Sequence, residues 1–222
     1  MARLLTPILL VSILLVYSGN PVYADTILFA NLTTSQEVPP TVPTTATGAP
    51  RPISFGTATF VLNTAQTAMT FSATIFNIDF TGTQTTDIND NLVAAHIHAG
   101  PAVAPGVNGP VVWGFFGTPF NDNNPNDVVN TPFATGVGGT ISGKWDAPEG
   151  NNTTFAAQLP NILAGLSYIN FHTTQFGGGE IRGQVLAIPE PETYALMLAG
   201  LAVIGTVARR RKHASVGSLN QT

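Results

Sequence analysis

Short strand-like segments separated by turn residues make up the middle of this chain, and no other feature limits its fold as strongly. The segments are rich in Val, Ile, Phe and Thr and are bounded by Gly, Pro and Asn, which is the composition of β-strands and of the turns between them. About eight strands are predicted, at residues 26–32, 56–63, 69–76, 92–98, 110–116, 138–145, 167–174 and 180–186. A helical turn is expected within 154–163. We therefore predict an all-β fold, an antiparallel β-sandwich.

The chain contains no cysteine, so its stability must come from a core, a backbone hydrogen-bond network or a bound ion. Side chains two positions apart on a strand face the same way, and this alternation predicts the core. The predicted core residues are Ile27, Phe29, Phe60, Phe71, Ile97, Ile169, Phe171, Ile181 and Val185. The Asn- and Pro-rich stretch 120–132 is expected to be a loop. Its Asp122 and Asp127 offer oxygen ligands for calcium, but without the spacing of an EF-hand.

Acidic residues outnumber basic ones in the middle of the chain. Residues 25–188 contain three Arg or Lys against ten Asp or Glu, which gives a formal net charge of −7, whereas the whole chain has −4. Such a surface repels phosphate backbones. We therefore expect no nucleic-acid partner.

The two ends of the chain have the composition of processing segments. Arg3 precedes an apolar run, and Val22-Tyr23-Ala24 offers the small residues that a signal peptidase reads. Residues 1–24 are therefore predicted to be a signal peptide, and the mature domain is expected at 25–188.

A Pro-Glu-Pro motif, a short apolar run and an arginine block follow this domain. Pro189-Glu190-Pro191 cannot continue a strand or a helix. The uncharged run 194–208 would form a helix of roughly 22 Å, against a hydrocarbon core of roughly 30 Å. The block Arg209-Arg210-Arg211 would stay on the cytoplasmic side, with residues 213–222 as a cytoplasmic tail.

This three-part tail, residues 189–212, resembles the PEP-CTERM sorting signal of exported bacterial proteins. The resemblance implies a short transmembrane span that is held transiently in the inner membrane until an exosortase-type transpeptidase cleaves near the Pro-Glu-Pro motif. It also implies a Gram-negative bacterium as the source, and the cell envelope or the extracellular space as the destination. A plain C-terminal stop-transfer anchor is the alternative interpretation.

Three blocks of the predicted domain, residues 31–40, 95–112 and 168–185, resemble the signature blocks of the CHRD domain, which is named after chordin. They include Ala95-His96-Ile97-His98-Ala99-Gly100 and Gly179-Glu180-Ile181-Arg182-Gly183-Gln184-Val185. The resemblance implies an exported domain but brings no agreed biochemical activity for the bacterial members. Growth-factor antagonism is not implied, because chordin's cysteine-rich modules have no counterpart in this sequence.

Three histidines are candidate ligands of a metal ion. His96 and His98 lie two apart on one predicted strand and share a face, and His172 lies on the polar face of another predicted strand. A His-x-His pair with a third imidazole is typical of copper or zinc sites. The His-x-His strand is also similar to the copper-binding strand of Cu/Zn superoxide dismutases. The expected sandwich is immunoglobulin-like or superoxide-dismutase-like.

A structural polar cluster is the alternative role for these side chains. Antiparallel register allows His172 to pair with Glu180 or Arg182 across the last hairpin, with Asn170 on the same face. In that case Asn170, Glu180 and Arg182 satisfy the histidines and the neighbouring loops by hydrogen bonds, without a metal.

Two function classes follow from these observations. The first is a non-enzymatic exported domain that acts in the cell envelope or the extracellular matrix, by adhesion or by binding polysaccharide or surface proteins, with no cofactor. The second is a copper- or zinc-binding protein or metalloenzyme that uses His96, His98 and His172. The first is favoured because it needs only the sorting tail and a stable sandwich. The sequence has no Gly-x-Ser-x-Gly motif and no cysteine, and no catalytic residue is predicted.

Overall fold

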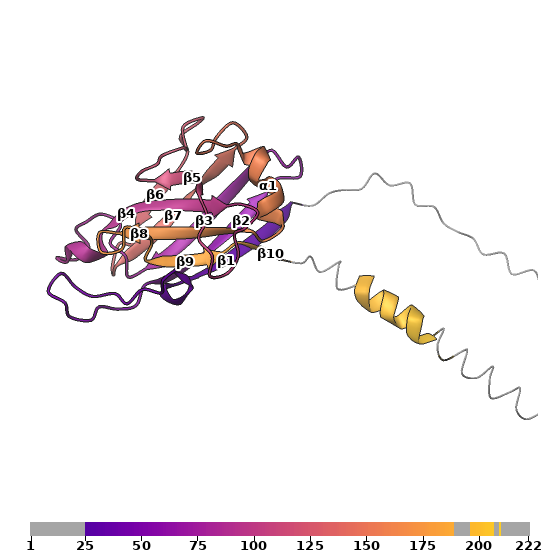
Figure 1. Ribbon diagram of the computed structural model, residues 1–222, viewed down its shortest axis with the longest axis horizontal. Helices are drawn as coiled ribbons and strands as arrows, with labels where there is room; N and C mark the ends of the chain where they lie inside the picture. Colours follow the sequence, from indigo (N-terminus) through magenta and orange to yellow (C-terminus); the bar gives the residue numbers. More distant parts are fainter. Residues whose placement is uncertain (1–24, 189–195, 207–208, 210–222) are drawn as a thin grey trace, which may run out of the picture.

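A computed structural model of the chain describes residues 25–188, 196–206 and 209 (Figure 1). The predicted signal peptide 1–24, the motif Pro189-Glu190-Pro191 and the expected tail 213–222 lie outside the described residues, as does the pair Arg210-Arg211. Residues 196–206 are helical and their side chains are exposed. Within the described residues, no helix is both long enough and apolar enough to cross a membrane.

Ten β-strands form one sheet, and every pairing between them is antiparallel. They are β1 (Thr26–Thr33), β2 (Phe55–Leu62), β3 (Ala68–Phe76), β4 (Leu92–Ala99), β5 (Val111–Phe116), β6 (Val129–Pro132), β7 (Gly138–Asp146), β8 (Ser167–Thr173), β9 (Ile181–Gln184) and β10 (Leu186–Ala187). Helix α1 (Phe155–Leu163) and two 3-10 turns, η1 (Thr34–Gln36) and η2 (Ile88–Asp90), complete the domain. The predicted all-β antiparallel fold is confirmed.

The sheet curls until its two halves face each other. Its strand order is β5-β4-β8-β9-β1-β2-β3-β7-β6, with β10 beside β1. Although β5 is at one end of this order, Trp113 of β5 stacks on Trp145 of β7 with ring centroids 5.5 Å apart. Phe115 of β5 packs with its ring tilted against that of Phe71 of β3, with centroids 4.7 Å apart. Aromatic rings from distant strands therefore fill a single core between the two halves, as in a sandwich.

The face of strand β1 that packs against the core is the opposite of the one that the sequence predicted. Seven of the nine predicted core residues are buried, but Ile27 is 46% exposed and Phe29 is 37% exposed. Leu28 and Leu32 are buried in their place. Both faces of β1 are apolar, so alternation alone could not choose between them, and a shift by one residue exchanges the faces.

Two further differences concern the ends of the sheet. Residues 129–132, which were expected to be part of a loop, form the edge strand β6 and pair with β7. The strand predicted at 180–186 is divided at Val185, so that β9 pairs with β8 and β10 pairs with β1. Short edge strands of this kind carry little hydrophobic alternation, which is the signal that sequence prediction uses.

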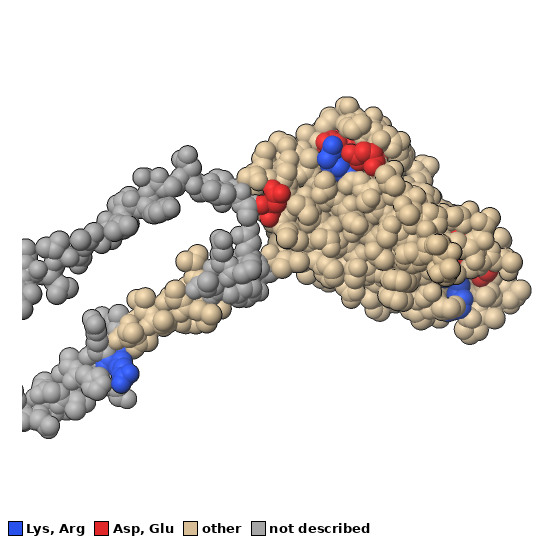
Figure 2. Space-filling view, turned by 180° about the vertical axis from the view of Figure 1, so that it is seen from behind, with Lys and Arg blue, Asp and Glu red and all other residues tan. Residues whose placement is uncertain are grey.

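Charged side chains are sparse on the face of the domain that Figure 2 shows, and basic and acidic groups lie beside one another there. Within residues 25–188, Arg51 and Arg182 are buried. Lys144 is partly exposed, and its Nζ lies 3.4 Å from Asp127 and 3.1 Å from Asp146. Lys144 therefore forms ion pairs with two carboxylates at once.

Candidate metal centre

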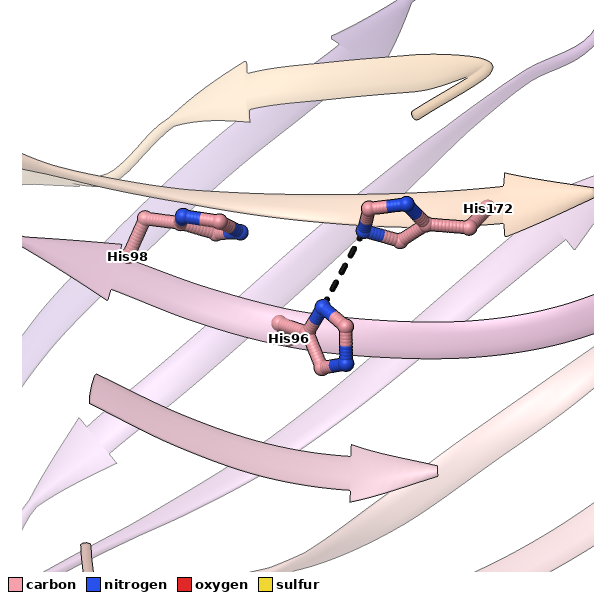
Figure 3. Close-up of side chains that lie close together, drawn as sticks. All are labelled: His96, His98 and His172. Atoms are coloured by element: carbon pink, nitrogen blue, oxygen red, sulfur yellow. Dashed lines mark hydrogen bonds between the residues drawn. The ribbon is translucent and has the colours of Figure 1, made fainter. Parts of the chain in front are cut away.

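The register of β4 against β8 brings the three predicted histidines to one face of the sheet. His96 lies opposite Asn170, and His172 lies opposite Ala94. Directly paired residues share a face, as do residues two apart. His98 therefore joins the same face, while Ile97 and Phe171 enter the core on the other. The predicted common face of His96, His98 and His172 is what the structure shows (Figure 3).

Loops cover this face, so the histidines are buried although they point away from the hydrophobic core. His96, His98 and His172 are 4%, 7% and 6% exposed. One potential ligand atom from each ring lies within 4.8 Å of the corresponding atom of the other two. The closest pair is His96 Nδ1 and His172 Nε2, 3.1 Å apart (dashed line in Figure 3).

Three loop carbonyls hold the rings by their outer nitrogens. Thr118 O lies 3.0 Å from His96 Nε2, Gly109 O lies 2.8 Å from His98 Nδ1, and Gly177 O lies 2.9 Å from His172 Nδ1. A carbonyl oxygen only accepts hydrogen bonds, so each of these nitrogens carries the proton. We assign the tautomers on this basis.

The same assignment leaves three unprotonated nitrogens that face one another. A neutral imidazole has a single N–H, so His96 Nδ1, His98 Nε2 and His172 Nε2 each keep a free lone pair. His98 Nε2 has no hydrogen-bond partner. The 3.1 Å contact between His96 and His172 then joins two acceptors, which is favourable only with a proton or a cation between them.

Burial keeps these rings neutral at pH 7. Burial, helped by the neighbouring imidazoles, lowers the pKa of His96 to about 4 and the pKa of His98 to about 4. Burial also lowers the pKa of His172. Neutral imidazole is the form that binds a metal ion, so the site needs no deprotonation before binding.

The histidine pKa values predict that the metal-free protein loses stability in acid. The ordinary histidine pKa is 6.5, while the folded state keeps His96 and His98 unprotonated down to about pH 4. Between these values the unfolded state binds more protons. The free energy of unfolding therefore falls as the pH falls from about 6.5 to about 4, by at most about 1.4 kcal/mol per pH unit for each histidine.

Glu37 opposes this trend, because burial raises its pKa from 4.5 to about 7. Its folded state binds more protons over that range, so its contribution to stability is lost as the pH rises. Two histidines outweigh one carboxyl group, and we expect a net loss of stability on acidification. Urea denaturation of chelator-treated protein between pH 7 and pH 4 measures this loss, and Glu37→Gln should make it steeper. Constant stability over this range would contradict the assignment of buried neutral histidines.

The three residues of the predicted polar cluster are not all close to the histidines. Asn170 is, since its Oδ1 lies 3.0 Å from His172 Nε2. Arg182 instead stacks over Tyr168 at 3.5 Å and donates hydrogen bonds to loop carbonyls, among them Val107 O at 2.9 Å. These hydrogen bonds hold the loop that contains Val107.

Glu180 belongs to a separate buried network. The register places it opposite His172, as predicted, because Phe171 pairs with Ile181. Its carboxylate nevertheless contacts Arg51 and Ser54 and accepts a 2.6 Å hydrogen bond from Thr173. Glu180 precedes the first residue of β9, so the strand pleat does not direct its side chain, and the expected contact with His172 is not formed.

Two features of the loops were not visible in the sequence. Glu37, from the Pro-rich loop after η1, is buried beside Asn170. Asp122 accepts hydrogen bonds from the backbone N–H of Asp127 and Val128, at 3.0 and 2.9 Å, so the calcium candidate loop uses this carboxylate to cap its own backbone. A single carboxylate in a loop carries no periodic signal from which such a position could be predicted.

Two family models match the chain. The CHRD domain model matches residues 28–185, and the model of the PEP-CTERM protein-sorting motif matches residues 187–212. No curated protein and no solved structure matches the chain. The three histidines and the carbonyls that hold them all lie within the first match.

Proposed function

The chain belongs to the CHRD domain family, and we propose that its domain binds one copper or zinc ion through His96, His98 and His172. The PEP-CTERM motif identifies an exported protein that an exosortase processes and that is sorted to the cell envelope or surface. The metal site would therefore act outside the cytoplasm. We also propose that residues 1–24 are removed as a signal peptide and that the tail is held transiently in the inner membrane before cleavage near Pro189-Glu190-Pro191.

The observation that carries the proposal is the convergence of three imidazole lone pairs. Metal-bound histidines usually donate the other ring N–H to a carbonyl or a carboxylate, which fixes the ring and its tautomer. Each of the three rings has such a carbonyl, from Thr118, Gly109 and Gly177. A purely structural histidine cluster would instead pair donors with acceptors, which the 3.1 Å contact between His96 and His172 does not do for neutral rings.

The donor set favours copper or zinc over magnesium or calcium. The described residues that could hold a metal together are three histidines, without an Asp, Glu or Cys. Imidazole suits copper and zinc, whereas magnesium and calcium prefer oxygen ligands. The rings are almost fully buried, which suits a site that holds a metal better than one that exchanges substrate at an open position. Adhesion, or binding of polysaccharide or surface proteins, stays a prediction from the export signal.

Calorimetric titration of the metal-free protein with zinc or copper at pH 7 tests the proposal. We expect one equivalent of metal per chain, and about 100-fold weaker binding for His98→Ala, which removes one of the ligands. The fourth histidine of the sequence, His213, provides the matched control, because His213→Ala should bind as tightly as the wild type. Absence of binding to the wild type, or equal binding by His98→Ala, would overturn the proposal.

A further inference from the structure

Asn170 presents its side-chain oxygen to the inner nitrogen of His172. Asn170 Oδ1 lies 3.0 Å from His172 Nε2, the same nitrogen that lies 3.1 Å from His96 Nδ1. The His172 and His96 rings have their single proton on the outer nitrogen, bound to Gly177 O and Thr118 O. The amide oxygen therefore faces a nitrogen that has no proton to donate, and it is a fourth electron-pair donor in the cluster.

Glu37 lies at the other end of the same amide. Its Oε1 is buried and has no hydrogen-bond partner among the described residues, and Glu37 Oε1 and Asn170 Nδ2 both lie beside Gly179. An amide nitrogen donates and a carboxyl oxygen accepts, so Glu37 selects the orientation in which Asn170 Nδ2 points to it. The amide oxygen is then directed to the histidines.

Gly179 makes this contact possible. Its φ is +124°, and a Cβ on it would collide with Glu37 Oε1 and would lie 2.9 Å from Asn170 Nδ2. A side chain at this position would separate the carboxyl group from the amide. The glycine in the turn before β9 thus leaves room for Glu37 and Asn170 to lie next to each other.

We propose that Asn170 Oδ1 is the fourth ligand of the metal and that Glu37 is a positioning residue, which holds the amide oxygen toward the ion. This inference rests on the proposed metal binding by the histidines. It assigns an N₃O ligand set that is entirely neutral. A side-chain amide oxygen is known as a weak axial ligand of copper, so Asn170 tunes the geometry of a copper site more than it anchors the ion.

Exchange of the two side chains provides a sharp test in the purified full-length chain. In the double variant Glu37→Gln/Asn170→Asp, the Gln amide donates to the Asp carboxylate, so the hydrogen bond is kept with its polarity reversed. A carboxylate oxygen then faces the metal and adds a negative charge. We expect copper(II) to bind at least 10-fold more tightly than to the wild type, a gain that misfolding cannot produce.

Single variants separate the two roles. Asn170→Ala should weaken copper(II) binding about 10-fold, which is less than His98→Ala does, and should change its electron paramagnetic resonance spectrum. Glu37→Ala should weaken copper(II) binding less than Asn170→Ala and should also change the spectrum. Glu37→Gln can still accept a hydrogen bond from the amide, so it should have the wild-type spectrum. Asn63→Ala, in the turn between β2 and β3, is the control and should change neither the copper(II) affinity nor the spectrum.

Absence of metal binding to the wild type would overturn the histidine site itself. Normal binding with wild-type spectra and affinity in Asn170→Ala and in the double variant would overturn only the roles of Asn170 and Glu37.

Discussion

Glu180→Ala is expected to lower the free energy of unfolding by about 3–5 kcal/mol, the typical cost of removing one partner of a buried ion pair. Glu180 is fully buried, and Arg51 is 8% exposed. Alanine would leave the Arg51 guanidinium without its carboxylate, and Ser54 and Thr173 would lose their acceptor. Since Arg51 belongs to the long loop between η1 and β2, the variant should also loosen that loop over the sheet.

Urea denaturation at pH 7 measures this effect against an exposed pair in the same domain. Lys144→Ala removes a partly exposed cation from Asp127 and Asp146, and it should lower the free energy of unfolding far less than Glu180→Ala does, because solvent screens such pairs. Glu180→Gln keeps the side-chain shape and one acceptor oxygen, so its cost should lie between the two. If Glu180→Ala were as mild as Lys144→Ala, the buried network would not stabilise the fold.

The strands and the common face of the histidines were predictable because both follow from a period of two along the chain. His96 and His98 share a face wherever residues 92–98 form a strand. The prediction failed where this local signal was ambiguous or missing. In β1 both faces are apolar, so Ile27 and Phe29 were assigned to the core although they are exposed.

The surroundings of the site could not be predicted, because they depend on contacts between distant loops. The carbonyls of Gly109, Thr118 and Gly177 fix the tautomers, but every residue has a carbonyl and nothing in the sequence marks these three. Glu180 and Arg51 are 129 residues apart in the chain. Their pairing depends on how a Pro-rich loop folds over the sheet, which residue patterns do not encode.

Metal removal is expected to lower the melting temperature of the protein by about 5–10 °C. A ligand that binds only the folded state adds about 2.7 kcal/mol at 100 times its dissociation constant. For a chain of this size, each kcal/mol corresponds to about 2–4 °C. A cation between His96 Nδ1 and His172 Nε2, which lie 3.1 Å apart, would stabilise the folded state in this way.

Thermal unfolding of the wild type with zinc or copper, and again after treatment with a chelator, tests the metal site most directly. The account predicts a lower melting temperature after chelation and full recovery when metal is added back. His98→Ala should melt at the same temperature under both conditions, and His213→Ala should behave as the wild type. A wild-type melting temperature that neither the chelator nor the added metal changes would contradict the account, and the three histidines would then be a metal-free structural cluster.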